Sequence, residues 1–123
     1  MKRAGMDRIG IFAELAATGV LIAAIVLLWR DNLHLLLAVL GIAAAVLALH
    51  HRKRDVIFFV VIAVLGSVAE GVFVHFGVWR YGNPSVLGIP MWFPVAFGTA
   101  GLLGARLVKS VSALWQQASD GEE

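Results

Sequence analysis

The sequence predicts an all-α, polytopic membrane protein: an antiparallel bundle of four transmembrane helices with a structured aromatic- and proline-rich outer loop between the third and fourth. Three observations predict this class. Hydrophobic residues make up 60% of the chain and charged residues only 15%, against about 25% charged in soluble domains. The mean hydropathy is +0.87. Four apolar runs are separated by short polar segments, and 123 residues provide about four spans of roughly 20 residues each.

The four spans are predicted at residues 9–29, 33–49, 56–78 and 90–114, and together they form a single transmembrane domain, 1–123. The first run has 21 residues, which exceeds the roughly 7 to 15 of a secretory signal, so we interpret it as a retained span. Arg106 and Lys109 interrupt the fourth run. The acidic tail, 116–123, is predicted to be disordered.

The basic residues predict the orientation, because Lys and Arg are retained on the cytoplasmic side. Eight of the ten lie at the N-terminus, in the second turn or near the C-terminal end, and two lie on the other side, at Arg30 and Arg80. We therefore predict a multi-pass protein of the cell (cytoplasmic or inner) membrane with both termini cytoplasmic. Although the pI is near 9.5, these clusters adjoin apolar runs, which argues against nucleic acid as a partner.

Two charged residues lie at matching depth inside the first and fourth spans. Glu14 and Arg106 are each about 8 Å from the cytoplasmic ends of their spans at ~1.5 Å per residue. An isolated charge within a span costs roughly 3 kcal/mol, so we predict a structural Glu14–Arg106 ion pair. The alternative is that the two side chains reach the interface separately.

Glu70 is the candidate functional residue, because an ionisable group inside a membrane points to function by default. It lies about 10 Å from the outer end of the third span at ~1.5 Å per residue. Aromatic residues of the following loop suit the membrane interface and form a lid above Glu70. We predict a small cavity facing the outer leaflet; its candidate ligand-binding residues are Glu70, Thr99, Trp79, Tyr81, Asn83, Trp92 and Arg80. His34 is a further candidate partner of Glu70. The alternative is that Glu70 only holds the loop down.

Metal and cofactor chemistry has little support in the sequence. The chain has no Cys, which excludes disulfides and Cys-ligated metals. His75 lies about 140° round a helix from Glu70, so the two cannot easily bind one ion. We interpret His50 and His51 as part of a solvated turn. We therefore expect no metal and no cofactor.

Small residues recur at four-residue spacing in the last two spans and allow helices to approach closely. They are Ala63, Ser67 and Gly71, then Gly101 with Ala105, and Ala100 with Gly104. These stripes predict packing faces within the bundle. They also allow a homo-oligomer or a larger membrane partner.

The C-terminal part carries a family resemblance. Its pattern is Ala69-Glu70, Gly77-Val78-Trp79-Arg80-Tyr81, Pro84, Leu87, Gly88-Ile89-Pro90, Trp92, Pro94 and Arg106-Leu107. This pattern resembles small, uncharacterised bacterial four-helix membrane proteins. It is also similar to the Insig sterol sensors and to membrane carotenoid enzymes, the bisanhydrobacterioruberin hydratases and small-subunit lycopene cyclases. The resemblance implies a polyisoprenoid-derived ligand.

Three functions follow as hypotheses. The first is non-enzymatic binding of a membrane lipid or isoprenoid in the cavity around Glu70. The second is an isoprenoid- or carotenoid-modifying enzyme in which Glu70 is the general acid, as the carotenoid resemblance implies. The third is a structural or assembly subunit of a membrane complex, in which case Glu70 would be dispensable.

Overall fold

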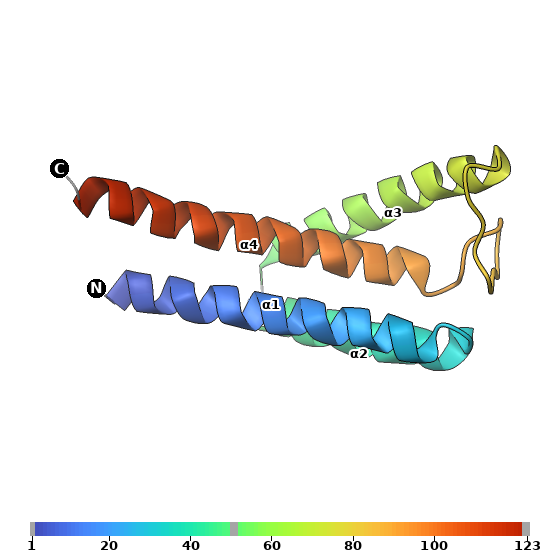
Figure 1. The fold of residues 1–123 in the computed structure, drawn as a ribbon, viewed down its shortest axis with the longest axis horizontal. Helices are drawn as coiled ribbons and strands as arrows, with labels where there is room; N and C mark the ends of the chain where they lie inside the picture. Colours follow the sequence, from blue (N-terminus) through green and yellow to red (C-terminus); the bar gives the residue numbers. More distant parts are fainter. Residues whose placement is uncertain (1, 50–51, 122–123) are drawn as a thin grey trace.

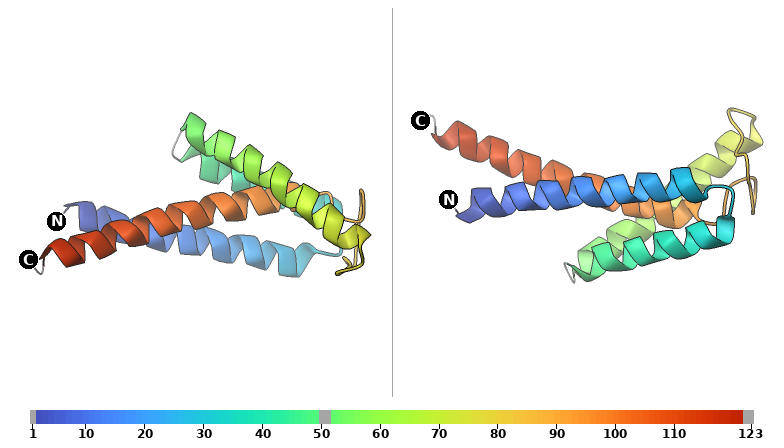
Figure 2. Two further views of the ribbon diagram at one scale, coloured as in Figure 1. Left: turned by 90° about the horizontal axis from the view of Figure 1, so that it is seen from above. Right: turned by 60° about the horizontal axis from the view of Figure 1, so that its bottom comes forward.

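The computed structural model describes residues 2–49 and 52–121 and consists of four helices (Figure 1). They are α1 (Lys2–Leu28), α2 (Asn32–Ala48), α3 (Lys53–His75) and α4 (Phe93–Gly121). The predicted all-α, four-helix class is therefore confirmed. Helix α4 packs against each of the other three, and α2 also packs against α1. Figures 1 and 2 show that the free ends of α1 and α4 extend beyond the end of α2 and the start of α3.

The helix ends differ from the predicted spans. Helix α1 begins seven residues earlier, at Lys2, and α3 ends at His75 instead of residue 78. Helix α4 begins at Phe93 instead of residue 90 and continues to Gly121. The tail that was predicted to be disordered is helical over 116–121, so the prediction is wrong there. Residues 122–123 lie outside the described part. Residues 116–121 are polar or small and mostly exposed, so no apolar pattern in the sequence marked them as helical.

The connection between α1 and α2 is a tight turn closed by a helix cap. Asp31 caps α2 by accepting a hydrogen bond from the backbone N–H of His34 at 3.1 Å. That backbone hydrogen bond, together with a contact from the His34 ring, holds the pKa of Asp31 below its usual value of 3.8. His34 therefore faces its own turn, and its expected contact with Glu70 is not formed.

The buried core lies mainly toward the loop end of the bundle. Its largest cluster combines residues of α1, α2, the α3–α4 loop and α4, namely Leu21, Leu35, Val39, Ile89, Trp92, Phe93 and Ala96. A second cluster, Val46, Leu102 and Leu103, continues it toward the other end. None of the described residues of α3 is fully buried. Helix α3 is therefore attached to the outside of the bundle, chiefly through α4.

Glycines bring α3 and α4 into close contact. A Cβ atom at Gly98 would lie 2.9 Å from the backbone oxygen of Phe59, and one at Gly101 would lie 2.6 Å from Ile62. Gly101 thus packs as its stripe predicts. Gly71 and Gly104 have no such neighbour within 4 Å, so they do not contribute to this interface. Gly98, which is not part of the predicted stripes, makes the closest approach to the backbone of α3.

Replacing Gly98 with leucine is expected to destabilise the α3–α4 pair by about 1–3 kcal/mol, because the obstructing atom belongs to the backbone of Phe59. Gly104→Leu is the matched control, since its side chain would enter open space. Thermal unfolding of both variants in one detergent compares them. Equal midpoints for the two variants would contradict this packing.

Two of the helices are long and apolar enough to cross a membrane. They are Arg8–Leu28 and Lys53–His75, each with a mean hydropathy of 2.5, and α2 is a shorter apolar helix. Only 11% and 6% of these two spans is buried. Their large apolar side chains are mostly exposed on the outside of the bundle.

Candidate functional site

The loop between α3 and α4, residues 76–92, has a defined backbone. It begins with a Schellman motif, in which Gly77 has φ +75° and the N–H of Val78 bonds to the oxygen of Phe73 at 2.9 Å. Further on, Val86 and Ile89 exchange two backbone hydrogen bonds of 3.0 Å. This closes a two-residue hairpin turn.

Leu87 and Gly88 form the tip of this hairpin with positive φ values of 51° and 81°. Such a turn favours glycine or asparagine at both positions, so a leucine costs roughly 1–2 kcal/mol of backbone strain. The leucine side chain is also 85% exposed. A strained and exposed leucine suggests that its side chain has a role outside the folded core.

Glu70 holds the first part of the loop to α3. The indole N–H of Trp79 donates to Glu70 Oε1 at 2.7 Å, and the hydroxyl of Tyr81 donates to the same oxygen. Trp79 also packs edge-on against Phe73, with ring centroids 5.2 Å apart. Burial, and then the hydrogen bond to Glu70, raise the pKa of the Tyr81 hydroxyl above its usual value of 10.0. One carboxylate oxygen thus anchors two aromatic side chains.

The remaining predicted site residues do not gather around Glu70. Thr99 is 1% exposed and donates to the backbone oxygen of Val95. Trp92 is buried in the core, and Arg80 is exposed. Asn83 donates to the backbone oxygen of Arg30 at 2.9 Å. The predicted cavity lined by all seven residues is therefore not present among the described residues.

The second part of the loop is held instead by the α1–α2 turn. Asn32 donates to the oxygen of Asn83 at 2.9 Å and to the hydroxyl of Ser85 at 2.8 Å, and it accepts from Trp92 at 3.2 Å. Asn32 was not among the predicted site residues. The only sequence feature that could have indicated this role is its position: Asn32 carries a polar amide beside the α1–α2 turn, at the same end of the bundle as the loop. The loop is consequently fixed at both ends.

An apolar groove lies beside this loop, on a face of α3 that does not include Glu70. It has a volume of about 560 Å³. Its lining residues are Ser67, Val68, Gly71, Val72, Val74, His75, Phe76, Leu87 and Ile89. The hairpin closes one side, because a Cβ at Gly88 would lie 2.5 Å from Val74. Ser67 Oγ is buried in the described structure without a hydrogen-bond partner.

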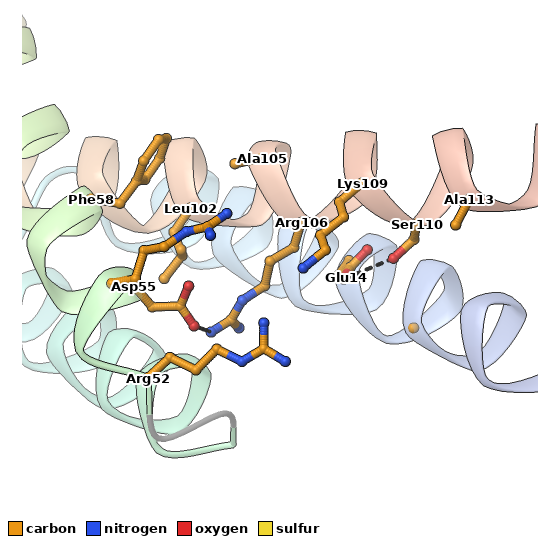
Figure 3. A pocket seen from close by; sticks show the side chains of 12 residues that line it. Glu14, Arg52, Asp55, Phe58, Leu102, Ala105, Arg106, Lys109, Ser110 and Ala113 are labelled. Atoms are coloured by element: carbon orange, nitrogen blue, oxygen red, sulfur yellow. Dashed lines mark hydrogen bonds and ion pairs between the residues drawn. The ribbon is translucent and has the colours of Figure 1, made fainter. Parts of the chain in front are cut away.

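The predicted Glu14–Arg106 ion pair is wrong in its acidic partner. Arg106 pairs with Asp55 at 2.7 Å and donates to the backbone oxygen of Val46 at 3.0 Å (Figure 3). Glu14 accepts a long hydrogen bond of 3.5 Å from Ser110. The physical reason is that α3 begins at Lys53, which places Asp55 in its first turn beside α4. The predicted third span begins only at residue 56, which leaves Asp55 in the preceding turn.

Comparison of the chain with protein-family models, with curated proteins and with solved structures gives no match.

Proposed function

We propose that this chain is an integral membrane protein whose four helices cross the bilayer, and that it binds a chain lipid in the apolar groove between α3 and the hairpin. The lipid is an acyl or isoprenoid lipid, and binding does not involve catalysis. The observation that carries the proposal is the groove itself: about 560 Å³, lined almost entirely by apolar side chains, on a helix that is barely buried.

The exposed surface of α1 and α3 supports membrane insertion. A core helix of a soluble protein would be mostly buried, whereas Val26 is 65% exposed, Leu27 79% and Leu65 62%. Soluble monomers rarely expose an apolar patch above a few hundred Å². The same surface is favourable when acyl chains surround it.

The two other helices also fit a membrane. Helix α2 has 17 residues and is about 26 Å long at ~1.5 Å per residue, a small mismatch that a bilayer accommodates by local thinning. The apolar first half of α4 ends at Arg106, beside the start of α3. Both chain termini lie at the same end of the bundle (Figure 1), as four crossings require.

The surroundings of the groove support a lipid as its occupant. Because α3 is attached from outside, the groove opens toward whatever surrounds α3, and inside a bilayer that is the lipid chains. Ser67 Oγ offers one polar partner, for example to an ester carbonyl or a hydroxyl of the lipid. The exposed Leu87 extends the apolar rim.

Glu70 has a supporting role in this proposal. Its Oε1 accepts two hydrogen bonds from the loop that walls the groove. A general acid must instead present a proton to a substrate. No observation in the described structure favours catalysis, and the proposal assigns Glu70 to positioning the loop.

Gly71→Trp tests the groove. The residue lines the groove and has nothing within 4 Å of an added Cβ, so a large side chain can be attached there to occupy the groove. Gly104→Trp is the control at an equally open helix position outside the groove. We expect mass spectrometry of lipids co-purified in mild detergent to show one lipid enriched in wild type and Gly104→Trp but lost in Gly71→Trp. Identical lipid profiles in all three would contradict the proposal and favour an assembly role.

A second variant separates binding from folding. Asparagine tolerates positive φ better than leucine, so Leu87→Asn is expected to retain or raise the unfolding midpoint while lipid retention falls. Val86→Asn is the control, because it also replaces an exposed apolar side chain with asparagine but lies outside the groove lining. Parallel loss of lipid from both variants would argue against a specific contact at Leu87.

A further inference from the structure

A second cavity lies at the opposite end of the bundle. It has a volume of about 520 Å³ and is bounded by α1, the start of α3 and the middle of α4. Figure 3 shows Arg106 and Lys109 reaching from α4 into this space, with Arg52 and Asp55 facing them from the start of α3. Arg54 and Glu14 also line it. Its lining is therefore rich in basic side chains, unlike that of the groove.

The charges of this cavity are only partly compensated. Arg106 is bonded to Asp55, with both side chains largely buried. Within the described part of the chain, Arg52, Arg54 and Lys109 have no ion-pair partner. Three cations thus share the cavity with a single further acid, Glu14. Apart from the Arg106–Asp55 pair, the cavity therefore has a net charge of +2: three positive charges from Arg52, Arg54 and Lys109, and one negative charge from Glu14.

Glu14 supplies the second, independent observation. Glu14 is only 8% exposed and lines the cavity, yet its carboxylate atom Oε2 has no hydrogen-bond partner in the described structure. A buried polar atom without a partner calls for an explanation, such as a ligand group. Ser67 Oγ and Glu14 Oε2 are the two such side-chain atoms among the described residues, and each lines one of the two cavities.

We infer that this cavity binds the headgroup of an anionic phospholipid: a phosphate held by Arg52, Arg54 and Lys109, and a hydroxyl that donates to Glu14 Oε2. Guanidinium groups bind phosphate oxygens in a bidentate manner through charge-assisted hydrogen bonds. Basic pockets between membrane helices at the cytoplasmic face are a recurring form of anionic headgroup site. A hydroxyl of the headgroup would supply the missing hydrogen-bond donor to Glu14 Oε2. A phosphoglycerol headgroup has both the phosphate and the hydroxyl.

The position of the cavity fits a headgroup. It lies where α3 begins, while the ends of α1 and α4 continue past it (Figures 1 and 2). That level is the membrane boundary if α2 and α3 cross the bilayer. The inference rests on membrane insertion, as the proposed function does, but it does not require the groove beside the loop.

The test uses the full chain in nonionic detergent with three probes: dihexanoylphosphatidylglycerol, dihexanoylphosphatidylcholine and inorganic phosphate. The midpoint of thermal unfolding is measured against probe concentration. We expect phosphatidylglycerol to raise the midpoint, while phosphatidylcholine and inorganic phosphate at equal concentration do not. High salt should weaken the effect, because the attraction is between charges. Equal stabilisation by phosphatidylcholine would overturn the assignment of an anionic headgroup. Equal stabilisation by inorganic phosphate would overturn the assignment of a lipid as the ligand.

Matched charge variants locate the site. Arg52→Gln with Arg54→Gln removes two charges that line the cavity, whereas Arg8→Gln with Lys53→Gln removes two nearby charges that do not. The first pair is expected to weaken the apparent phosphatidylglycerol affinity roughly tenfold or more, since a hydrogen bond to a charged group contributes about 1.5–3 kcal/mol. The second pair should retain it. Equal weakening by both pairs would overturn the inference.

These outcomes are distinguishable from failure of the proposed function. If Gly71→Trp loses its lipid but phosphatidylglycerol has no effect on any variant, the inference alone fails. If phosphatidylglycerol acts as expected but the Gly71→Trp and wild-type lipid profiles agree, the inference stands and the groove proposal fails.

Discussion

Replacing Arg106 with alanine is expected to destabilise the bundle by about 3–5 kcal/mol, the usual cost of removing one partner of a buried ion pair. The substitution leaves Asp55 largely buried beside α4 and also removes the hydrogen bond to the backbone of Val46. Because this contact joins α2, α3 and α4, all three helices should lose stability together. Reversible unfolding in mixed micelles, followed by circular dichroism, measures the change.

A double-mutant cycle identifies the acidic partner. We expect Arg106→Ala and Asp55→Ala to be strongly coupled, since Arg106 Nη2 and Asp55 Oδ2 are 2.7 Å apart. Coupling between Arg106→Ala and Glu14→Ala should be smaller, because Glu14 bonds to Ser110. Stronger coupling to Glu14 would contradict the structure and restore the pairing expected from the sequence.

Glu70→Ala is expected to release the first part of the loop. Trp79 and Tyr81 both lose their acceptor, at a cost of about 1.5–3 kcal/mol, the range for a hydrogen bond to a charged group. Since the cluster is only partly buried, the two bonds should not add in full. Faster hydrogen exchange across residues 76–82, with slow exchange kept in α1, would show local release.

Glu70→Gln and Tyr81→Phe separate anchoring from ligand binding. Glutamine keeps an acceptor oxygen, so its effect on the loop should be milder than that of alanine. Tyr81→Phe removes one donor and leaves Glu70 in place. Loss of the lipid in Glu70→Gln with an unchanged loop would show that Glu70 contacts the ligand directly, contrary to the role assigned here.

The fold class was predictable because apolar runs and short turns are local features of the sequence. The extent of α4 was not, since its last turns are mostly exposed and carry no apolar pattern. Asp55 was misplaced for a similar reason: its pairing depends on where α3 begins, and span boundaries are the least certain feature of an apolar pattern.

The site was predictable in part. A carboxylate inside an apolar run followed by aromatic residues indicated a contact between Glu70 and the loop, and Tyr81 makes it. The groove was not predictable, because Val74, Leu87 and Ile89 are ordinary apolar residues in sequence. Only the hairpin, which sets the backbone at Leu87 and Gly88, brings them together. The role of Asn32 was not predictable, because its hydrogen-bond partners are more than 50 residues away in the chain.

The central claim is a membrane-embedded protein with a lipid in the groove between α3 and the hairpin. Photo-crosslinking tests it most directly. The protein is reconstituted into phosphatidylcholine nanodiscs in which some acyl chains carry a diazirine, irradiated, digested and mapped by mass spectrometry. We expect adducts concentrated at residues 67–76 and 86–89, in clear excess over the equally exposed apolar face of α1. Adducts spread evenly over all exposed apolar residues, or failure of the chain to enter the nanodisc, would contradict the claim.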